Sequence, residues 1–307
     1  MMFNQADNQL IWKNGELIKW DDSNVHILSH TLHYGTGVFE GVRAYQTSKG
    51  GAIFRLEDHT SRLFNAATKL NINIPYSVKE INEAQIDVLK ANNLEEAYIR
   101  PIVYLGNESL GLRATDLSVN VAVAAWEWPS YMSPEKKELG LSIIKSSHEQ
   151  YSNPLHAGNK IIGTYINSTL ALHEALAKGA DEALMLDKHG NISEGSGENI
   201  FIVKDNEILT PKTEYCLNGL TRQSIIKIAQ DHKIKVSEAD LRYEDLVDAD
   251  EAFFTGTAVE VMPITAVDSY TIGNGKRGEI SHLLQQKYSD IVSGKELAYS
   301  SWLTHID

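Results

Sequence analysis

The sequence predicts an α+β protein with two domains. Its 307 residues suffice to bury more than one core, and a composition of 42% hydrophobic and 22% charged residues is ordinary for a globular protein. Segments with the spacing of strands and of helices alternate along the chain. Near residue 130 two prolines and a charged run favour a linker. We expect a small N-terminal α/β domain over residues 1–128, a linker over 129–138 and a larger C-terminal domain over 139–307.

Charge and cysteine content exclude several classes of protein. The net charge of −13 argues against a nucleic-acid partner or an anionic membrane, because both require clustered Lys and Arg. The single cysteine, Cys216, cannot form an intrachain disulfide and fits a reducing compartment. The N-terminus lacks the pattern of a signal peptide, and no apolar run approaches the roughly 18–20 residues of a membrane helix. We expect a cytoplasmic protein.

In the first half of the chain, turn and capping signals place the elements. Asn14-Gly15 between two apolar runs predicts a hairpin over residues 9–20. Ser77, followed three residues later by Glu80, is the pattern of a capping box and predicts a helix from there to about Asn92. Periodicity and residue type predict a helix over residues 56–70 and strands over 52–54, 97–105 and 119–125.

The second half repeats this mixture. Gly179 can end a helix that begins at Tyr165. Two further helices are expected over residues 221–232 and around 280–291, and strands over 141–144, 183–187, 199–203 and 251–254.

Lys160 is the first candidate for chemistry, because it lies in an apolar stretch just before a helix. Burial disfavours the charged form of a lysine, so its amine becomes available as the nucleophile that Schiff-base chemistry needs. A lysine beside Ile161 and Ile162 can equally well extend to the surface.

The segment 192–201 is a second candidate, because glycines and serines surround Glu194 between two strands. Glycine lets the backbone approach a ligand closely, and a carboxylate there could keep a pyridine nitrogen protonated. The alternative is a glycine-rich hairpin with a solvated glutamate.

Three segments could bind an anion. Gly219-Leu220-Thr221 opens a helix whose first N–H groups can bind phosphate, although the same pattern fits an ordinary capped helix. Gly256-Thr257 is a second donor-rich turn, and Arg55 at the end of a strand could supply the charge. The spacing of His26, His30 and His33 fits one helical face, but no acidic ligand joins them, so we expect no metal site.

Five motifs together resemble the branched-chain amino acid aminotransferases, which belong to the class-IV, fold-type-IV group of pyridoxal-phosphate (PLP) enzymes. They occur in the family's order over roughly residues 10–300, with Lys160 about 34 residues before Glu194. The motifs are His33-Tyr34-Gly35 with Val38 to Arg43, Tyr98-Ile99-Arg100-Pro101, Ile192 to Phe201, Gly219 to Arg222, and Gly256 to Glu260.

The resemblance implies a fold like that of D-amino acid aminotransferase, with a mixed, barrel-like sheet in the larger domain. It also implies the cofactor contacts. Lys160 would form a Schiff base with PLP and shuttle the proton at the substrate Cα, Glu194 would pair with the pyridine nitrogen, and Tyr165 would bond the ring's phenolic oxygen. The phosphate would be held by Arg55, Leu220, Thr221, Gly256 and Thr257.

The implied reaction exchanges an amino group between branched-chain L-amino acids (leucine, isoleucine, valine) and 2-oxoglutarate. It gives branched-chain 2-oxo acids and L-glutamate in a ping-pong sequence through a pyridoxamine intermediate. The resemblance further implies a homodimer or an assembly of dimers. The implied substrate contacts are Tyr34, Phe39, Gly41, Arg43, Tyr98, Arg100, Leu110, Trp128, Tyr131, Thr257 and Ala258, with Arg100 facing the second carboxylate of glutamate and Leu110 reaching the neighbouring subunit's site.

Other fold-type-IV enzymes share the lysine and the glutamate, namely D-amino acid aminotransferases, (R)-amine aminotransferases and aminodeoxychorismate lyase. The motifs at Val38 to Arg43 and Tyr98 to Pro101 favour the branched-chain type. Two departures from the family pattern, the segment 153–159 and the bulky Trp126, leave the side-chain preference open.

Overall fold

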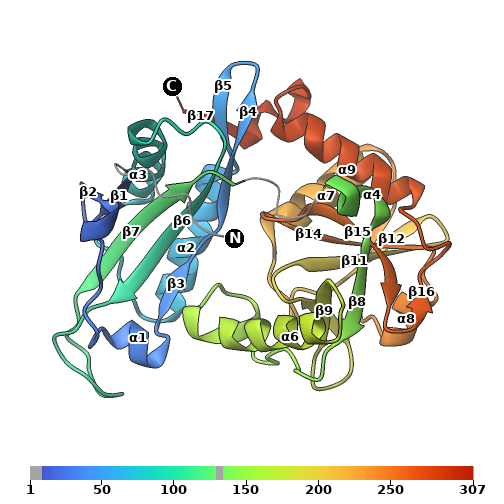
Figure 1. The fold of residues 1–307 in the computed structure, drawn as a ribbon, viewed down its shortest axis with the longest axis horizontal. Coiled ribbons are helices and arrows are strands. Elements are labelled where there is room, and N and C mark those ends of the chain that lie inside the picture. Colours follow the sequence, from blue (N-terminus) through green and yellow to red (C-terminus); the bar gives the residue numbers. More distant parts are fainter. Residues whose placement is uncertain (1–8, 129–133, 307) are drawn as a thin grey trace. The chain divides into compact units, whose positions relative to one another are not determined.

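The computed structural model describes residues 9–128 and 134–306, which pack into two compact units (Figure 1). Unit 1 comprises residues 9–128, 160–164 and 291–306, and unit 2 comprises residues 134–159 and 165–290. A division of the chain at one linker near residue 130 would assign residues 160–164 and 291–306 to the second domain, whereas these two segments belong to unit 1. Because residues 129–133 lie outside the described part of the chain, the linker at 129–138 and the domain bounds stay a prediction.

Unit 1 is built on an eight-stranded sheet in the order β17-β5-β4-β6-β7-β1-β2, with β3 paired to β6. Its pairs are antiparallel, and β17 joins from the C-terminal end by pairing with β5. Helices α2 and α3 contact each other and this sheet. The strands are β1 Leu10–Lys13, β2 Glu16–Lys19, β3 Gly37–Phe39, β4 Val42–Thr47, β5 Gly50–Phe54, β6 Ala97–Leu105, β7 Val119–Trp126 and β17 Leu303–His305. The helices are α1 His30–Tyr34, α2 Leu56–Lys69 and α3 Val78–Ala91, with 3-10 turns η1 Trp20–Asp22, η2 Ile162–Thr164 and η3 Leu297–Trp302.

Unit 2 is built on a nine-stranded mixed sheet in the order β10-β9-β8-β15-β14-β11-β12-β13, with β16 paired to β15. Three of its pairs are parallel, β8 with β9, β8 with β15, and β12 with β13. The strands are β8 Leu141–Lys145, β9 Glu182–Leu186, β10 Ile192–Gly195, β11 Asn199–Lys204, β12 Glu207–Pro211, β13 Val236–Ala239, β14 Glu251–Gly256, β15 Glu260–Val267 and β16 Tyr270–Thr271. The helices are α4 Pro134–Leu139, α5 Pro154–Ala157, α6 Tyr165–Ala177, α7 Leu220–Asp231, α8 Tyr243–Val247 and α9 Glu279–Val292.

The expected turn and cap signals operate as their chemistry predicts. The Ser77 side chain accepts from the backbone N–H of Glu80, and the Glu80 carboxylate accepts from Ser77, which completes a capping box at the start of α3. Gly35 ends α1 in the left-handed conformation, so the chain turns at once into β3. The predictions of an α+β protein and of a mixed sheet in the second half are confirmed.

Two apolar clusters stabilise unit 2. Residues from β8, β9, β10, β11, β14 and β15 form the larger core with apolar side chains next to α8. In the smaller cluster α6 places Ala171 and Ala175 against β8 and β9, and these small side chains let the helix lie close to the sheet. The beginning of α6, at Tyr165, is therefore fixed in position.

Candidate active site

Lys160 lies where residues 160–164 join unit 1. Its carbonyl oxygen accepts a hydrogen bond of 3.1 Å from the Phe39 N–H, and Ile161 forms an antiparallel bridge with Val38. Close approach of Gly35 and Gly163 permits this pairing, since a Cβ on Gly35 would lie 2.5 Å from the Gly163 Cα. A short strand-like pairing with β3 thus holds the lysine.

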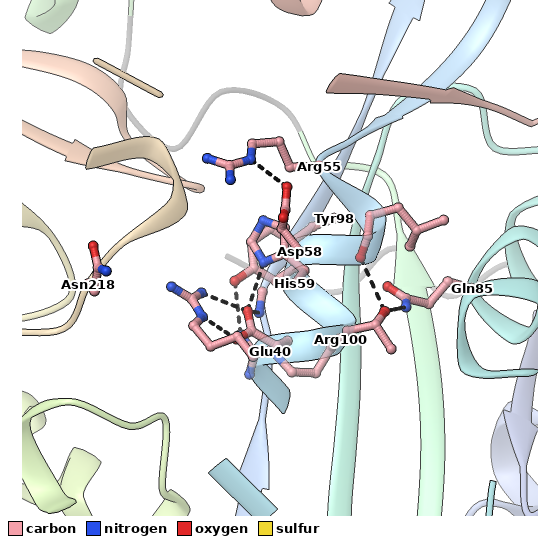
Figure 2. Close-up of polar contacts among 12 residues, drawn as sticks. Glu40, Arg55, Asp58, His59, Gln85, Tyr98, Arg100 and Asn218 are labelled. Carbon is pink, nitrogen blue, oxygen red and sulfur yellow. Dashed lines mark hydrogen bonds and ion pairs between the residues drawn. The ribbon is translucent and has the colours of Figure 1, made fainter. Parts of the chain in front are cut away.

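The side chains around Lys160 in unit 1 are aromatic and cationic. Lys160 Nζ lies 5.3 Å from the centroid of the Phe39 ring, and the Arg100 guanidinium carbon lies 4.8 Å from the same centroid. Arg100 Nη2 donates to the Tyr98 hydroxyl at 3.2 Å (Figure 2). The Tyr98 ring packs 4.7 Å from that of Trp128. Both cations favour the electron-rich face of Phe39.

Arg100 carries a buried donor that suits an anion. Its Nε is buried and has no hydrogen-bond partner among the residues that the structure describes. Leaving a buried charged donor unpaired costs free energy, so a ligand carboxylate would fit this position.

Glu40, the residue after Phe39, belongs to an ionic cluster, Glu40–His59–Arg62, in which Glu40 and His59 are buried and Arg62 is partly buried. The Glu40 carboxylate accepts from Arg62 Nε at 2.6 Å and Nη2 at 2.9 Å, and it lies 2.8 Å from His59 Nδ1 (Figure 2). Burial opposes ionisation of Glu40, but the Arg62 charge and the hydrogen bonds from His59 and Arg62 hold its pKa well below the ordinary value. Burial lowers the pKa of His59 in spite of the Glu40 contact, so His59 is neutral at pH 7 and donates from Nδ1.

Arg55, the residue before α2, and Arg62, on α2, lie in different surroundings. Arg55 precedes the helix with a φ of 50°, and its Nε pairs with Asp58 at 2.7 Å. Arg62 lies two turns further along, at the Glu40 carboxylate and thus one residue from Phe39. Among the described residues of unit 1, Arg62 is the arginine of α2 that joins the Phe39–Lys160 group, and no motif in the sequence pointed to it. Its spacing of three from His59 on one face of α2 was the available signal.

In unit 2 the buried Glu194 carboxylate is held by amide donors. Oε1 accepts from Gln150 Nε2 at 2.7 Å, and Oε2 accepts from the Leu217 N–H at 3.2 Å and from Asn199 Nδ2 at 3.4 Å. Three donors fix both oxygens in place. Burial and the Glu194 charge together raise the pKa of the Cys216 thiol. Gln150 and Asn199 were not expected, because an amide far along the chain carries no sequence pattern.

The two expected anion-binding segments of unit 2 lie at the start of α7 and at the end of β14. Helix α7 begins after Gly219, which has no side chain to cap it, so the positive end of the helix dipole lies at Leu220 and Thr221. Gly219 needs to be small, since a Cβ would lie 2.1 Å from Asn199 Oδ1. Gly256 ends β14, next to the buried Thr255, and Thr255 Oγ1 has no hydrogen-bond partner within the described residues.

The remaining expected residues are dispersed. Arg43 is buried on β4 and pairs with Glu96 at 3.3 Å. Tyr34 and Leu110 are exposed on α1 and after β6, and Tyr165 is half-buried at the start of α6. Thr257 and Ala258 follow β14. Tyr131 lies outside the described residues.

The amino-transferase class IV family matches residues 37–267 of this sequence. The chain belongs to the class-IV aminotransferase family. Its curated relatives include the branched-chain-amino-acid aminotransferase of Pseudomonas aeruginosa, which is 52% identical over 296 residues and covers 96% of both chains. The branched-chain-amino-acid aminotransferase of Escherichia coli K12 is 39% identical over 300 residues, with 97% of both chains covered.

Solved structures agree with this class-IV assignment. The T.th. branched-chain amino acid aminotransferase with pyridoxamine 5'-phosphate superposes with a TM-score of 0.96 at 41% identity, covering 99% of this chain and 100% of that chain. The same enzyme complexed with N-(5'-phosphopyridoxyl)-L-glutamate has a TM-score of 0.94 at 41% identity and the same coverage. The expected fold of a fold-type-IV aminotransferase is confirmed. Within the described residues, no helix has the length and apolar character needed to cross a membrane.

Proposed function

We propose that this chain is a PLP-dependent aminotransferase that exchanges the amino group of leucine, isoleucine or valine with 2-oxoglutarate. The relatives named above carry that activity in their names, at 39–52% identity. Solved structures of one neighbour hold a phosphopyridoxyl-glutamate adduct and, in another crystal, 4-methylvaleric acid, a branched apolar acid.

The surroundings of Phe39 support this substrate pair most directly. One ring contacts both Lys160 and Arg100, and Tyr98 and Trp128 add apolar surface beside it. Aromatic rings suit the side chain of leucine, whereas Arg100, with its buried Nε, suits the second carboxylate of glutamate. A pocket that accepts both leucine and glutamate needs an apolar surface and a cation close together.

The residues present fit PLP. A buried carboxylate held by three donors, Glu194, can pair with a protonated pyridine nitrogen, and the start of α7, where a glycine lets a ligand approach the positive end of the helix dipole, can take a phosphate. When bound, PLP supplies the electron sink that stabilises negative charge at the substrate Cα. Lys160 would attach the cofactor through its ε-amine and then move the proton at Cα.

The other roles follow from position. Tyr165 would donate its hydroxyl to the phenolic oxygen of the ring, which fixes the ring's tilt. Leu220, Thr221, Gly256 and Thr257 would bind the phosphate through N–H and hydroxyl groups, with positive charge from an arginine of α2. Arg55 remains one candidate for that charge, and Arg62 is the stronger one because its contact with Glu40 places it next to Phe39, which bonds the Lys160 carbonyl. Tyr34, Gly41, Arg43, Leu110, Tyr131 and Ala258 would complete the substrate contacts.

Single-turnover titration of the PLP-loaded protein tests the proposal. L-leucine and L-glutamate should each remove the visible absorption of the holoenzyme, and D-alanine and (R)-1-phenylethylamine should not. Conversion by D-alanine or by the amine alone would assign the chain to another fold-type-IV activity. Release of pyruvate from aminodeoxychorismate without a 2-oxo acid would identify the lyase.

Arg100→Met separates the two substrates. Loss of a hydrogen bond to a charged group should lower kcat/KM for L-glutamate by roughly 10–100-fold, while L-leucine changes little. Equal losses for both amino acids would contradict the assigned role of Arg100.

We also propose a homodimer in the cytoplasm. Leu28 and Leu32 are exposed next to the loop that carries Leu110 and Leu112, since His30 N and Nε2 contact the carbonyls of Gly106 and Gly111. Adjoining exposed leucines are typical of a surface that a partner covers. Sedimentation equilibrium of the wild type and of Leu112→Glu should give a dimer and a weakened dimer, and a monomeric wild type would refute the assembly.

A further inference from the structure

The cluster Glu40–His59–Arg62 of unit 1 has no role so far beyond the charge of Arg62. Its carboxylate is almost fully buried, at 1% exposure, and its residue lies between two substrate-lining positions, Phe39 and Gly41. Burying a carboxylate is costly even when it is paired, and replacing such a pair by apolar residues is often neutral or stabilising. The contribution of Glu40 to stability alone is therefore a weak explanation for its position.

The contact between Glu40 and Arg62 fixes the orientation of a guanidinium. Nε and Nη2 of Arg62 both bond the carboxylate, at 2.6 and 2.9 Å, which uses two of the five N–H donors. Because the guanidinium is planar, this two-point contact sets the plane of the remaining donors. A single contact would leave the long side chain free to rotate.

His59 supports the same carboxylate from one turn earlier on α2. It is 2% exposed, and its Nδ1 lies 2.8 Å from the Glu40 oxygen that also bonds Arg62 Nη2. With His59 neutral, the charges of Glu40 and Arg62 cancel, so the carboxylate does not attract an anion. If the Glu40 carboxylate strengthens anion binding, it must do so by orienting Arg62, and this gain must exceed the repulsion between the carboxylate and the anion.

We propose that Glu40 is a positioning residue for the phosphate of the cofactor, holding the Arg62 guanidinium in the plane in which it binds that anion. Glu40 acts through Arg62 and does not contact the ligand. The proposal rests on the proposed function, because it takes PLP as the ligand and Arg62 as a phosphate contact.

The affinities of PLP and pyridoxal, measured by absorbance titration of the full-length apoprotein, test this role. The two ligands share the ring and the aldehyde but differ in the phosphate, so the ratio of their Kd values reports the phosphate site alone. Glu40→Gln should raise the Kd of PLP at least about tenfold, the factor of one hydrogen bond to a charged group, and change that of pyridoxal less than about twofold. Arg62→Lys should do the same, and the double variant should add little to either single variant.

A matched control is Glu251→Gln. Glu251 is likewise a hydrogen-bonded carboxylate, accepting from Ile280 N, Ser281 N and Ser281 Oγ, but it lies at the opposite end of β14 from Thr257. This variant should lower the unfolding midpoint without changing the ratio of the two Kd values. If Glu40→Gln does not fold, Glu40→Asp, which keeps the charge but shortens the reach, should shift the ratio in the same direction.

Three results would overturn the proposal. An unchanged ratio in Glu40→Gln means that Glu40 only stabilises the fold, and tighter PLP binding means that it competes with the phosphate. Fully additive effects of Glu40→Gln and Arg62→Lys mean that the two residues act independently. A wild-type protein that binds pyridoxal as tightly as PLP would instead overturn the phosphate site of the proposed function, and the role of Glu40 with it.

Discussion

Gly41→Ala tests the geometry of the proposed substrate-lining segment most sharply. Gly41 is buried between β3 and β4, and it does not have a positive φ, so alanine is compatible with its backbone. A Cβ there would lie 1.9 Å from the Tyr98 hydroxyl oxygen and 2.8 Å from the ring carbon that bears it. The effect of the substitution is therefore steric.

The size of the effect follows from how tightly Tyr98 is held. Its hydroxyl must withdraw by roughly 1.5 Å to restore an ordinary van der Waals contact. The hydroxyl bonds Arg100, and the ring packs 5.2 Å from Trp126 and 4.7 Å from Trp128, so both arrangements must shift. Misplacement of about 1 Å near a reacting centre can cost on the order of 10²-fold in rate, and we expect a loss of that order in kcat/KM for L-leucine.

Steady-state kinetics and a thermal melt of Gly41→Ala give the result, with Tyr98→Phe as the companion variant. Removing the hydroxyl relieves the shorter clash but leaves the ring carbon, so Gly41→Ala in a Tyr98→Phe background should recover part of the loss. A folded Gly41→Ala protein with kcat/KM within about threefold of the wild type, well short of the 10²-fold loss, would refute the reasoning.

Three further predictions concern charge. Lys160→Ala should abolish both turnover and the visible absorption of bound PLP, measured by spectroscopy after gel filtration. Glu194→Gln should lower kcat by about 10²-fold or more in steady-state assays, because the amide cannot keep the pyridine nitrogen protonated. The pKa of His59 is lowered from 6.5 in the folded protein, so below pH 6.5 the unfolded chain binds more protons than the folded one. The free energy of unfolding therefore decreases as the pH falls below 6.5. The lowered pKa of Glu40 decreases it further below about pH 4.5. Urea midpoints of His59→Gln across this range should vary less with pH than those of the wild type, and a parallel dependence would contradict the assignment.

The elements that could be predicted are those specified by local chemistry. The hairpin at Asn14-Gly15 and the capping box at Ser77 depend on neighbours within a few residues, and both form where expected. Short elements such as α5 and β16 carry too little pattern to be recognised. The pairing of β17 with β5 joins Leu303 to Phe54, and no local signal specifies a contact between segments so far apart in the sequence.

The candidate site divides in the same way. Lys160, Glu194 and the start of α7 belong to local motifs and could be named from the sequence. The side chains that orient such residues come from distant segments and became visible only in the fold. Gln150 bonds Glu194, and Arg62 bonds Glu40, the residue after Phe39. Residues that carry a reaction tend to lie in motifs, whereas residues that orient them can come from any element within reach.

Under the proposed function, recognition of both substrates at Phe39 would depend on its neighbours in unit 1. A benzyl ring by itself offers only an apolar wall, which suits leucine and rejects glutamate. Here one cation, Arg100, lies 4.8 Å from the ring centroid, so the same wall presents a charge without burying it alone in apolar surroundings. The Phe39 backbone is fixed in turn by its hydrogen bond to the Lys160 carbonyl, and the next residue is fixed by Arg62 and His59. The ring on β3, the cation on β6 and Lys160 are therefore held against one another from three segments of unit 1, and under the proposed function a shift of any of them would alter substrate selectivity and rate together.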